Sequence, residues 1–384
     1  MPKKRILEFS TFAKIGGTQK ILLDFLRHAS HEKYDYSLCV LLEHDVLNEE
    51  VSLLGLENTS LHMRGYWDLT AWWKLYCFAK PRHFDLIRTY GLKADIIGRL
   101  VRKLLGIPVH ITSVRSTDPW RKWYHVLLDS LTSSCTDLYL SNSEAGRIAV
   151  CRRERVPEAK TFTIPNGIDL TRFNPLSIDE NRVKAMKACW GIGPSTKTIG
   201  IVANLCRMKG HDQLIDALPQ IQSRFPDLKC LCAGTDFLNG KIQQYARRRS
   251  SEQAVIFSGF QKDIPEILAL IDIFVLPSLW EGMPTAILEA MAMKTPVIAS
   301  AVGGIPELLE HGKSALLIPP AEPDALAEAV LSLLDNPEFS NELAENAYQR
   351  VHKHFSLDAM VSQTEALYER LIDQHLPLKK ADAS

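Results

Sequence analysis

The sequence predicts an α/β protein built from two doubly wound, Rossmann-like domains. Short, apolar, β-rich runs alternate with amphipathic helical runs along most of the chain, a pattern typical of parallel sheets with helical crossovers. The same alternation starts again after a turn-rich segment near the middle of the chain. The length of 384 residues also suits two domains of ordinary size. Because such sheets bind ligands at the carboxyl ends of their strands, we expect a ligand crevice between the two domains.

The first half of the chain carries one complete series of alternating elements. Two long helices are expected at residues 18–29 ("TQKILLDFLRHA") and 92–106 ("LKADIIGRLVRKLLG"). The strands of this series are expected at residues 5–10, 36–42, 84–90, 109–114, 137–143 and 161–165. We therefore assign residues 1–166 to an N-terminal domain.

The second series follows a segment rich in Pro, Asn, Asp and Gly at residues 164–182, which is typical of turns and linkers. Its strands are expected at residues 198–204, 228–234, 254–259, 273–278, 296–300 and 315–320. Three helical runs then close the chain at residues 323–335, 337–355 and 356–372. We assign residues 167–355 to a C-terminal domain and residues 356–384 to a final helix and tail.

Composition excludes several classes of protein. The sequence is 46% hydrophobic and 23% charged, as in soluble globular proteins with large cores, and it holds no apolar run long enough to span a bilayer. The N-terminus lacks the pattern of a signal peptide, and the eight scattered cysteines show no metal-finger spacing. We therefore expect a cytoplasmic protein with reduced thiols and no nucleic-acid partner.

The formal net charge of zero hides an asymmetry between the two halves of the chain. Residues 1–170 hold 24 Lys and Arg against 19 Asp and Glu, whereas residues 171–384 hold 21 against 26. A basic first half favours anionic partners. Two solvated surfaces that merely differ in charge would give the same numbers.

Two loops between a strand and a helix hold residues suited to phosphates. Gly16 and Gly17 precede a helix whose free N–H groups could face an anion, although such a pair on its own is more often just a turn. Asn204, Arg207 and Lys209 follow a strand and precede another helix. A guanidinium and an ammonium there suit a diphosphate; the alternative is an ordinary solvated basic loop.

The segment "PSLWEGMPTAILEAMAMKTPVIAS" carries two carboxylates in an apolar setting. Pro284 suits a first helical position, which places Glu281 in the loop and Glu289 within the helix. The helix offers Glu289 no cation at i±4, and burying an unpaired carboxylate is costly. We therefore expect groups outside the segment, such as sugar hydroxyls, to satisfy these carboxylates. Thr285 would offer its N–H at the helix start to a negative group.

The glycine pair Gly303–Gly304 follows a further strand. It predicts either close approach of the backbone to a ligand or a plain turn.

Taken together, these motifs resemble the retaining nucleotide-sugar glycosyltransferases of the GT-B group called group 1, or family four. The resemblance is densest in "IPNGIDLTRF", "KGHDQLIDAL", "LPSLWEGMPTAILEAMAMKTPVIAS" and "GGIPELLEHGKSALLIPP", and looser in "GGTQKILL", "LGIPVHITS" and "DLYLSNSEA". The spacing of Glu281 and Glu289 matches the E-x7-E signature of that family. The resemblance implies a GT-B fold with a catalytic crevice, and a final helix that crosses back to the N-terminal domain; packing on its own domain is the alternative.

The resemblance also implies roles for the domains and for single residues. The N-terminal domain, residues 1–166, would bind the acceptor, and the C-terminal domain, residues 167–355, would bind the nucleotide sugar. Glu281 would contact the transferred sugar and Glu289 the nucleotide ribose, while Arg207 and Lys209 neutralise the diphosphate. We therefore expect Glu281, Arg207 and Lys209 to be catalytic, and Arg115 and Tyr90 to lie on the acceptor side. The expected donor-binding residues are Gly16, Gly17, Asn204, Gly259, Phe260, Met283, Pro284, Thr285 and Glu289.

Three positions depart from the family pattern. Ala203-Asn204-Leu205 replaces the common G-R-L, so the phosphate arginine has to be Arg207. Pro284 replaces a usual glycine and removes one N–H from the phosphate cradle. Val114 and Arg115 stand where many members carry a histidine, so Arg115 could contact the acceptor or a phosphate instead.

The resulting prediction is transfer of a sugar from a nucleoside diphosphate, with UDP favoured, to a hydroxyl acceptor with retained configuration. Because the chain contains no D-x-D motif, we expect no cofactor and no metal, with cations and a helix N-terminus stabilising the leaving group. A paired-carboxylate hydrolase is a weaker use of the two glutamates. An epimerase, a phosphorylase or a non-catalytic sugar-nucleotide-binding protein on the same fold remain alternatives.

Aromatic and basic residues are interleaved in two N-terminal segments, "RGYWDLTAWWKLYCFAKPRHF" and "RSTDPWRKWYHVLLDSL". Trp and Tyr favour the headgroup region of a bilayer, and basic residues favour anionic lipid. The pattern predicts a peripheral protein on the cytoplasmic membrane that acts on an anionic or lipid-linked acceptor. The alternative is that these aromatic residues pack inside the domain or line the cleft of a soluble acceptor. The tryptophans concerned are Trp67, Trp72, Trp73, Trp120 and Trp123.

Overall fold

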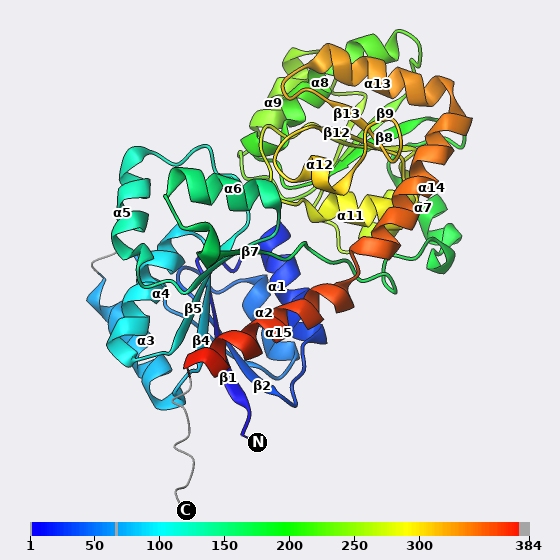
Figure 1. Ribbon diagram of the computed structural model, residues 1–384. Helices are drawn as coiled ribbons and strands as arrows, with labels where there is room; N and C mark the ends of the chain where they lie inside the picture. The colour runs from blue at the N-terminus through cyan, green and yellow to red at the C-terminus, as the bar shows by residue number, and fades with distance from the viewer. Residues whose placement is uncertain (1, 66–67, 376–384) are drawn as a thin grey trace, which may run out of the picture. The chain divides into compact units, whose positions relative to one another are not determined.

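The computed structural model describes residues 2–65 and 68–375 of the chain. It divides into two compact units: unit 1 comprises Met1–Pro165 and Asp358–Ser384, and unit 2 comprises Asn166–Leu357. Each unit contains one parallel sheet with helices on both faces (Figure 1). The two doubly wound, Rossmann-like units predicted from the alternating pattern are therefore confirmed.

Unit 1 is built on a seven-stranded sheet in the order β3-β2-β1-β4-β5-β6-β7, in which every described pairing is parallel. Its strands are β1 (Lys4–Ser10), β2 (Tyr34–Val40), β3 (Glu57–Ser60), β4 (Leu86–Tyr90), β5 (Val109–Val114), β6 (Leu138–Ser141) and β7 (Thr161–Thr163). Its helices are α1 (Gly17–His28), α2 (Val46–Leu53), α3 (Leu69–Ala79), α4 (Leu92–Leu105), α5 (Trp123–Ser133), α6 (Glu144–Arg153) and α15 (Leu357–His375). The strand order reverses between β1 and β4, which is where such sheets bind ligands.

Unit 2 is built on a six-stranded parallel sheet in the order β10-β9-β8-β11-β12-β13. Its strands are β8 (Thr198–Val202), β9 (Lys229–Ala233), β10 (Val255–Gly259), β11 (Ile273–Leu276), β12 (Val297–Ser300) and β13 (Leu316–Ile318). Its helices are α7 (Glu180–Cys189), α8 (His211–Gln222), α9 (Lys241–Arg248), α10 (Ile264–Leu270), α11 (Thr285–Ala292), α12 (Ile305–Leu308), α13 (Pro323–Asp335) and α14 (Pro337–His354). Here the order reverses between β8 and β11, so the loops after these two strands lie at the switch point.

The C-terminal helix α15 belongs to unit 1, although the chain reaches it from unit 2. It buries a stripe of apolar side chains, and Tyr368 lies with its ring 6.1 Å from that of Phe25 in α1. The hydroxyl of Tyr368 donates to Glu8 in β1 (3.1 Å) and accepts from Arg88 in β4 (2.9 Å). Figure 1 shows α15 in red beside the blue α1. The buried stripe consists of Leu357, Met360, Val361, Thr364, Leu367, Tyr368, Leu371 and Ile372.

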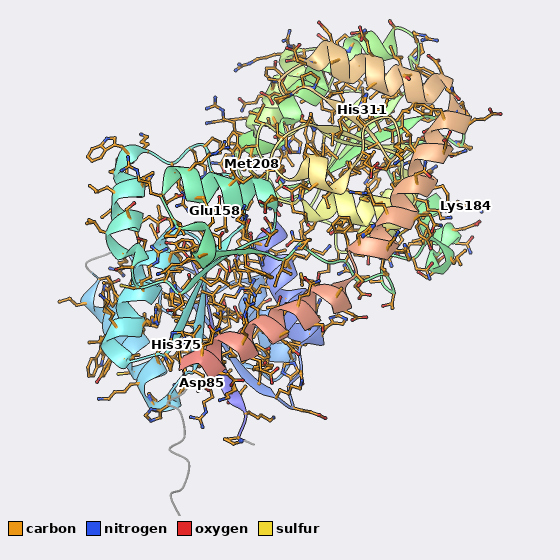
Figure 2. The ribbon with its side chains drawn as sticks, viewed as in Figure 1. Asp85, Glu158, Lys184, Met208, His311 and His375 are labelled. Atoms are coloured by element: carbon orange, nitrogen blue, oxygen red, sulfur yellow. The ribbon has the colours of Figure 1, made fainter. Side chains whose placement is uncertain are left out.

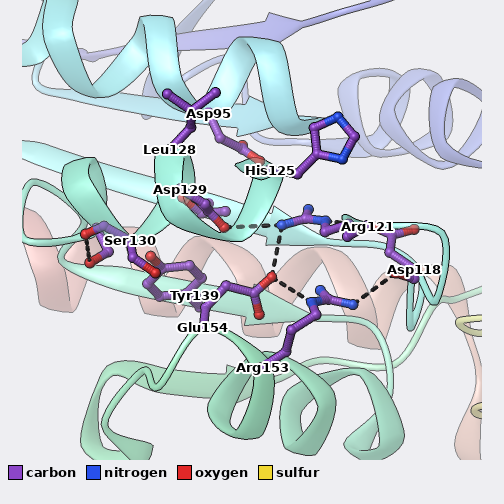
Figure 3. A network of polar contacts seen from close by, with 12 residues as sticks. Asp95, Asp118, Arg121, His125, Leu128, Asp129, Ser130, Tyr139, Arg153 and Glu154 are labelled. Atoms are coloured by element: carbon purple, nitrogen blue, oxygen red, sulfur yellow. Dashed lines mark hydrogen bonds and ion pairs between the residues drawn. The ribbon is translucent and has the colours of Figure 1, made fainter. Parts of the chain in front are cut away.

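A buried network of charged side chains joins α4, α5 and the residue after α6 in unit 1. Figure 3 shows the part of it around Asp129, Arg121 and Glu154. Arg99 of α4 is fully buried and pairs with Asp129 of α5. Arg121 donates to Asp129 (3.0 Å) and to Glu154 (2.9 Å), so one guanidinium bridges two carboxylates. Buried charges of this kind are stable only as a connected set, because removing one partner leaves another charge uncompensated.

Asp95 lies beside this network and makes stability dependent on pH. Burial raises the pKa of Asp95 to about 7, although Arg99 and the hydroxyl of Thr89, 2.6 Å away, oppose the shift. The folded state therefore binds a proton that the unfolded state releases between pH 4 and pH 7. The free energy of unfolding should fall as pH rises through this window, by at most about 1.4 kcal/mol per pH unit.

Asp95→Asn should reduce this dependence, because Glu8 and Glu154, whose pKa values burial also raises, keep their share of it. The variant should be more stable than wild type at pH 8. Urea unfolding at a series of pH values measures it, with the exposed Asp35→Asn as the matched control. Equal pH slopes for wild type and Asp95→Asn would contradict the assignment.

Candidate active site at the switch point of unit 2

The loop after β8 is held against the end of β11 by a glycine. Gly210 adopts φ +66°, and a Cβ at this position would lie 1.9 Å from the carbonyl oxygen of Pro277. No other residue therefore fits without moving the backbone. The amide of Leu279 donates to the carbonyl of Met208 (2.8 Å), a residue labelled in Figure 2. These contacts place Lys209 directly beside the loop after β11.

Glu281 in the loop after β11 is buried, with 4% of its surface exposed, and is bound by two donors. The ammonium of Lys209 lies 2.5 Å from its Oε1, and the hydroxyl of Ser278 donates to the same oxygen over 2.8 Å. The expectation that a group outside the glutamate segment satisfies this carboxylate is thus met by a cation 72 residues away in sequence. The structure brings together two of the three residues predicted to be catalytic.

The third of them, Arg207, lies in the same short 3₁₀ turn as Lys209 (Arg207–Lys209) and is exposed. Its guanidinium is therefore accessible to an anion from solvent. Asn204, earlier in this loop, accepts from the amide of Thr235 (3.1 Å) and so links the ends of β8 and β9.

The glycine pair after β12 supports the turn that carries Glu281. Gly303 adopts φ +55°, and a Cβ there would lie 2.1 Å from the carbonyl oxygen of Glu281. The amide of Gly304 donates to the carbonyl of Gly282 (2.8 Å). In this structure the close approach predicted for the pair is to the backbone of the glutamate loop.

Helix α11 begins one residue later than expected. Pro284 was predicted at the first helical position, but it has extended backbone angles (φ −71°, ψ 123°) and precedes the helix, which starts at Thr285. The free N–H groups of the first turn are therefore those of Thr285 and the residues after it. Met283, just before, is fixed by Asn166, whose side-chain amide donates to the Met283 carbonyl (2.7 Å).

Glu289 lies in the second turn of α11, and all of its helical neighbours from Ile287 to Ala292 are buried as well. Only 3% of Glu289 is exposed. A carboxylate at this depth requires hydrogen-bond donors, as the sequence predicted. Its predicted contact with a ribose stays a prediction.

Gly259 and Phe260 lie at the carboxyl end of β10, the edge strand next to β9. Gly259 adopts φ +70°, and its carbonyl accepts from the amide of Gly234 (2.8 Å). Phe260 is exposed and could offer its ring to a planar base. The positions are compatible with the predicted contact with a nucleobase, which stays a prediction.

Two residues of this site were not predicted from the sequence. Ser278 is completely buried and orients Glu281, and its spacing of three residues from that glutamate was the only available signal. His211 follows Gly210 and is also buried. Burial, together with the nearby charge of Lys209, lowers the pKa of His211 to about 4, so its imidazole is neutral at physiological pH.

The residues predicted in unit 1 lie at the carboxyl ends of its strands. Tyr90 ends β4 and is buried, whereas Arg115 follows β5 and is partly exposed, with its guanidinium 5.6 Å from the centre of the Tyr90 ring. Both line a small cavity together with Arg88 and apolar side chains of α1 and α15. Burial raises the pKa of Glu8 in this cluster and lowers that of Arg115 to about 10.

Gly16 and Gly17 mark the start of α1. The helix was expected to open at Thr18 but includes Gly17, and Gly16 has extended angles (φ −143°, ψ −174°) that any residue can adopt. The backbone of Gly16 therefore does not require a glycine here. The predicted contact of this pair with a diphosphate stays a prediction.

In the described residues, no group of three or more His, Cys, Asp or Glu side chains is arranged to hold a metal ion. The charged groups at the switch point of unit 2 are instead a lysine, an arginine and two glutamates. A cation beside a buried carboxylate, at the start of a helix with free N–H groups, can bind an anionic leaving group and the polar group next to it.

Comparison with known proteins finds one glycosyltransferase family model in each half of the chain. Residues 184–350 match the family model "Glycosyl transferases group 1", and residues 15–172 match "Glycosyltransferase Family 4". The chain is 25% identical over 383 residues to the Escherichia coli UDP-Gal:alpha-D-GlcNAc-diphosphoundecaprenol alpha-1,3-galactosyltransferase, covering 95% of this chain and 97% of the relative. It is 26% identical to the N-acetyl-alpha-D-glucosaminyl L-malate synthase of Bacillus anthracis, with 79% of each chain covered.

Among solved structures, Anabaena HepE in complex with UDP and glucose superposes with a TM-score of 0.85 at 20% identity, covering 96% of this chain and 100% of that one. Sucrose-phosphate synthase from Thermosynechococcus elongatus superposes with a TM-score of 0.81 at 20% identity, covering 97% and 100%. At this level of identity the two structures establish the fold alone.

The fold, the two family models and the glycosyltransferase relatives define a two-unit glycosyltransferase of the GT-B class. The two family models together account for most of the chain. The protein belongs to the group 1, or family four, glycosyltransferases.

Proposed function

We propose that this enzyme transfers a sugar from UDP to a hydroxyl of a lipid-linked or cell-envelope glycan precursor, with retained configuration. The observation that carries the proposal is the ion pair between Lys209 and Glu281 at the switch point of unit 2, beside the start of α11. It puts a positive charge next to a buried carboxylate at the place where parallel sheets bind nucleotides.

Each residue of the site has a role in this proposal. Lys209 and Arg207 neutralise the diphosphate as it leaves, and the free N–H groups of α11 add to that field. Glu281 faces the sugar, where positive charge develops in the transition state. Glu289 accepts hydrogen bonds from the ribose hydroxyls.

The proposed donor and stereochemistry draw on relatives. The E. coli relative is named for a UDP-Gal donor and an alpha-1,3 product. The B. anthracis relative is named for an alpha-D-glucosaminyl product. An α-linked donor would give such products with retention.

The proposed acceptor and location follow the same reasoning. The E. coli relative is named for a diphosphoundecaprenol-linked acceptor, and a relative from Rhizobium meliloti is named for lipopolysaccharide core biosynthesis. We place the enzyme in the cytoplasm at the inner membrane face, where lipid-linked acceptors are presented. The guanidinium of Arg115, partly exposed after β5, would suit an anionic group of such an acceptor.

Incubation with a panel of UDP- and GDP-sugars tests the proposal. A glycosyltransferase should release the nucleoside diphosphate from one donor, faster when the acceptor is present. An epimerase would interconvert sugars without releasing nucleotide, and a binding protein would do neither. A thermal-shift series with the same panel identifies the donor, since a ligand that binds the folded state raises its stability.

Glu289→Ala should weaken UDP binding by about 10- to 100-fold, because hydrogen bonds to a charged group contribute about 1.5–3 kcal/mol. Calorimetry with UDP and GDP measures the affinities. Glu289→Gln, which keeps the shape of the side chain, is the matched control for packing and should bind with intermediate affinity. Unchanged affinity of Glu289→Ala for both nucleotides would exclude the ribose assignment.

A further inference from the structure

Helix α5 of unit 1 has its apolar face turned away from the protein. A surface helix normally buries an apolar stripe against the core and exposes its polar residues. In α5 the only buried residue is Asp129, whereas Trp123 and Leu131 are 75% and 69% exposed. The exposed apolar and aromatic side chains of this helix are Trp123, Tyr124, Leu127, Leu128 and Leu131.

Ion pairs and hydrogen bonds hold α5 in this orientation, as Figure 3 shows in part. Asp129 points inward to Arg99 of α4 and Arg121 of the preceding loop. Arg99 also donates to the carbonyl of Asp129 (3.2 Å) and to the hydroxyl of Thr132 (3.0 Å). The inner face of the helix is thus charged and bonded, which leaves the apolar face with no core to cover.

The neighbouring helices α4 and α3 extend this surface. The three helices pack in a row on one side of the unit 1 sheet (Figure 1). Leu100 and Leu104 of α4 are exposed, as are Leu69 and Trp73 of α3. Trp120, in the loop before α5, is exposed too. We call the exposed side chains of α3, α4, α5 and Trp120 the apolar face.

The aromatic residues predicted to meet a membrane thus differ in exposure. Trp73, Trp120 and Trp123 belong to the apolar face. Trp72 is half-buried against the core of unit 1. Trp67 lies outside the described residues.

Within the three helices the exposed charges are all positive, while Asp68 and Asp118 lie in the segments before α3 and α5. The three helices contain two carboxylates, Asp95 and Asp129, and both are buried. Lysines supply exposed charge on and next to the helices: Lys74 in α3, Lys93 and Lys103 in α4, and Lys122 just before α5. An apolar and aromatic surface bordered by cations complements a bilayer that carries anionic headgroups.

We propose that the apolar face is the surface by which this protein lies on an anionic phospholipid bilayer. The inference deepens the proposed function, on which it rests, because it identifies the part of the chain that meets the membrane holding a lipid-linked acceptor. In the described chain no helix is long and apolar enough to cross a bilayer. The apolar side chains enter the interface, and the lysines stay at the headgroups.

Flotation of the full-length protein with vesicles tests the inference. Binding should appear with phosphatidylcholine–phosphatidylglycerol vesicles, be weak with phosphatidylcholine alone, and decrease with salt. The triple substitution Trp123→Ser, Leu127→Ser and Leu131→Ser should lower the partition coefficient by about tenfold or more. The pair Lys103→Glu and Lys122→Glu should also lower it by about tenfold or more.

Matched controls change exposed residues of the same type elsewhere. Leu53→Ser with Leu176→Ser, and Lys184→Glu with Lys241→Glu, should bind vesicles like wild type; Figure 2 labels Lys184. Absence of binding to anionic vesicles at low salt would overturn the inference, and so would equal binding of the triple variant. A triple variant that instead changes the oligomeric state in light scattering would assign the face to contacts between copies of the chain.

Release of UDP from the donor panel separates this inference from the proposed function. The triple and lysine variants should release UDP from a soluble donor at the wild-type rate, since none of the changed residues belongs to the switch-point site. Loss of vesicle binding with UDP release retained supports the inference. Vesicle binding without UDP release from any donor would support the apolar face as the membrane-binding surface and overturn the proposed function.

Discussion

Glu281→Gln is expected to lower the turnover number by about 10²- to 10³-fold, with a much smaller change in affinity for UDP. The substitution keeps a group that can accept from Ser278 Oγ, which lies 2.8 Å from Oε1, but removes the negative charge. If Glu281 faces the transferred sugar, that charge stabilises the transition state more than the bound donor. Loss of one preorganised electrostatic group of this kind typically lowers turnover by about 10²- to 10³-fold. Steady-state kinetics with the donor found in the panel, together with UDP calorimetry, measure the two effects separately.

Lys209 provides the internal comparison for this prediction. Lys209→Ala should weaken nucleotide binding, because the ammonium is assigned to the diphosphate, and it also leaves the buried Glu281 without its cation. The double variant should therefore lose less than the sum of the two single variants. Ser278→Ala, which removes a positioning hydroxyl and no charge, should lower turnover by a smaller factor. Equal turnover of wild type and Glu281→Gln would exclude a role for the carboxylate at the sugar.

The fold was predictable because most strands carry a local signal. Runs such as residues 273–276 are apolar and β-rich, and they become central strands buried on both faces. Strand β3 was missed. Its sequence "ENTS" is polar and it lies at the edge of the sheet, where pairing with β2 and not an apolar pattern makes it a strand.

The residues of the site were predictable one loop at a time, but their contacts were not. The sequence placed Lys209 and Glu281 after two different strands, and only the strand order makes β8 and β11 neighbours. The need for glycine at positions 210 and 303 likewise comes from carbonyl groups distant in sequence, those of Pro277 and Glu281. Local patterns therefore identify the candidates, and topology joins them.

In the aromatic segments, too, the local sequence does not decide which side chains are buried. Trp72 and Trp73 are adjacent, yet one packs on the core and the other is exposed. In α5 the apolar residues have helical spacing and would ordinarily be assigned to a core. The buried charge of Arg99, which pairs with Asp129, decides which face turns inward, and no property of the α5 segment alone reveals that partner.

Removal of α15 is expected to unfold unit 1. A chain that ends before Ser356 loses the buried stripe of this helix and uncovers the side chains beneath it, including Phe25. Burial of each large apolar side chain contributes about 1.5–3 kcal/mol, so the loss amounts to about 10 kcal/mol or more. This is comparable to the whole stability of a typical domain. The truncated chain should therefore lose the cooperative unfolding of unit 1 and its solubility, as circular dichroism, calorimetry and sedimentation can show.

Tyr368→Phe tests the hydroxyl of Tyr368 separately from the apolar contacts of α15. The substitution keeps the ring packed on Phe25 but leaves the buried Arg88 and Glu8 without the hydroxyl that bonds to both. Because an unsatisfied buried polar group costs about 1–3 kcal/mol, the free energy of unfolding should fall by about that amount. Tyr348→Phe, at a half-buried tyrosine of α14, is the matched control and should have little effect. A truncated chain that stays soluble, as stable as wild type and fully active would contradict the structural role of α15. A Tyr368→Phe protein as stable as wild type would show that Arg88 and Glu8 do not need the hydroxyl.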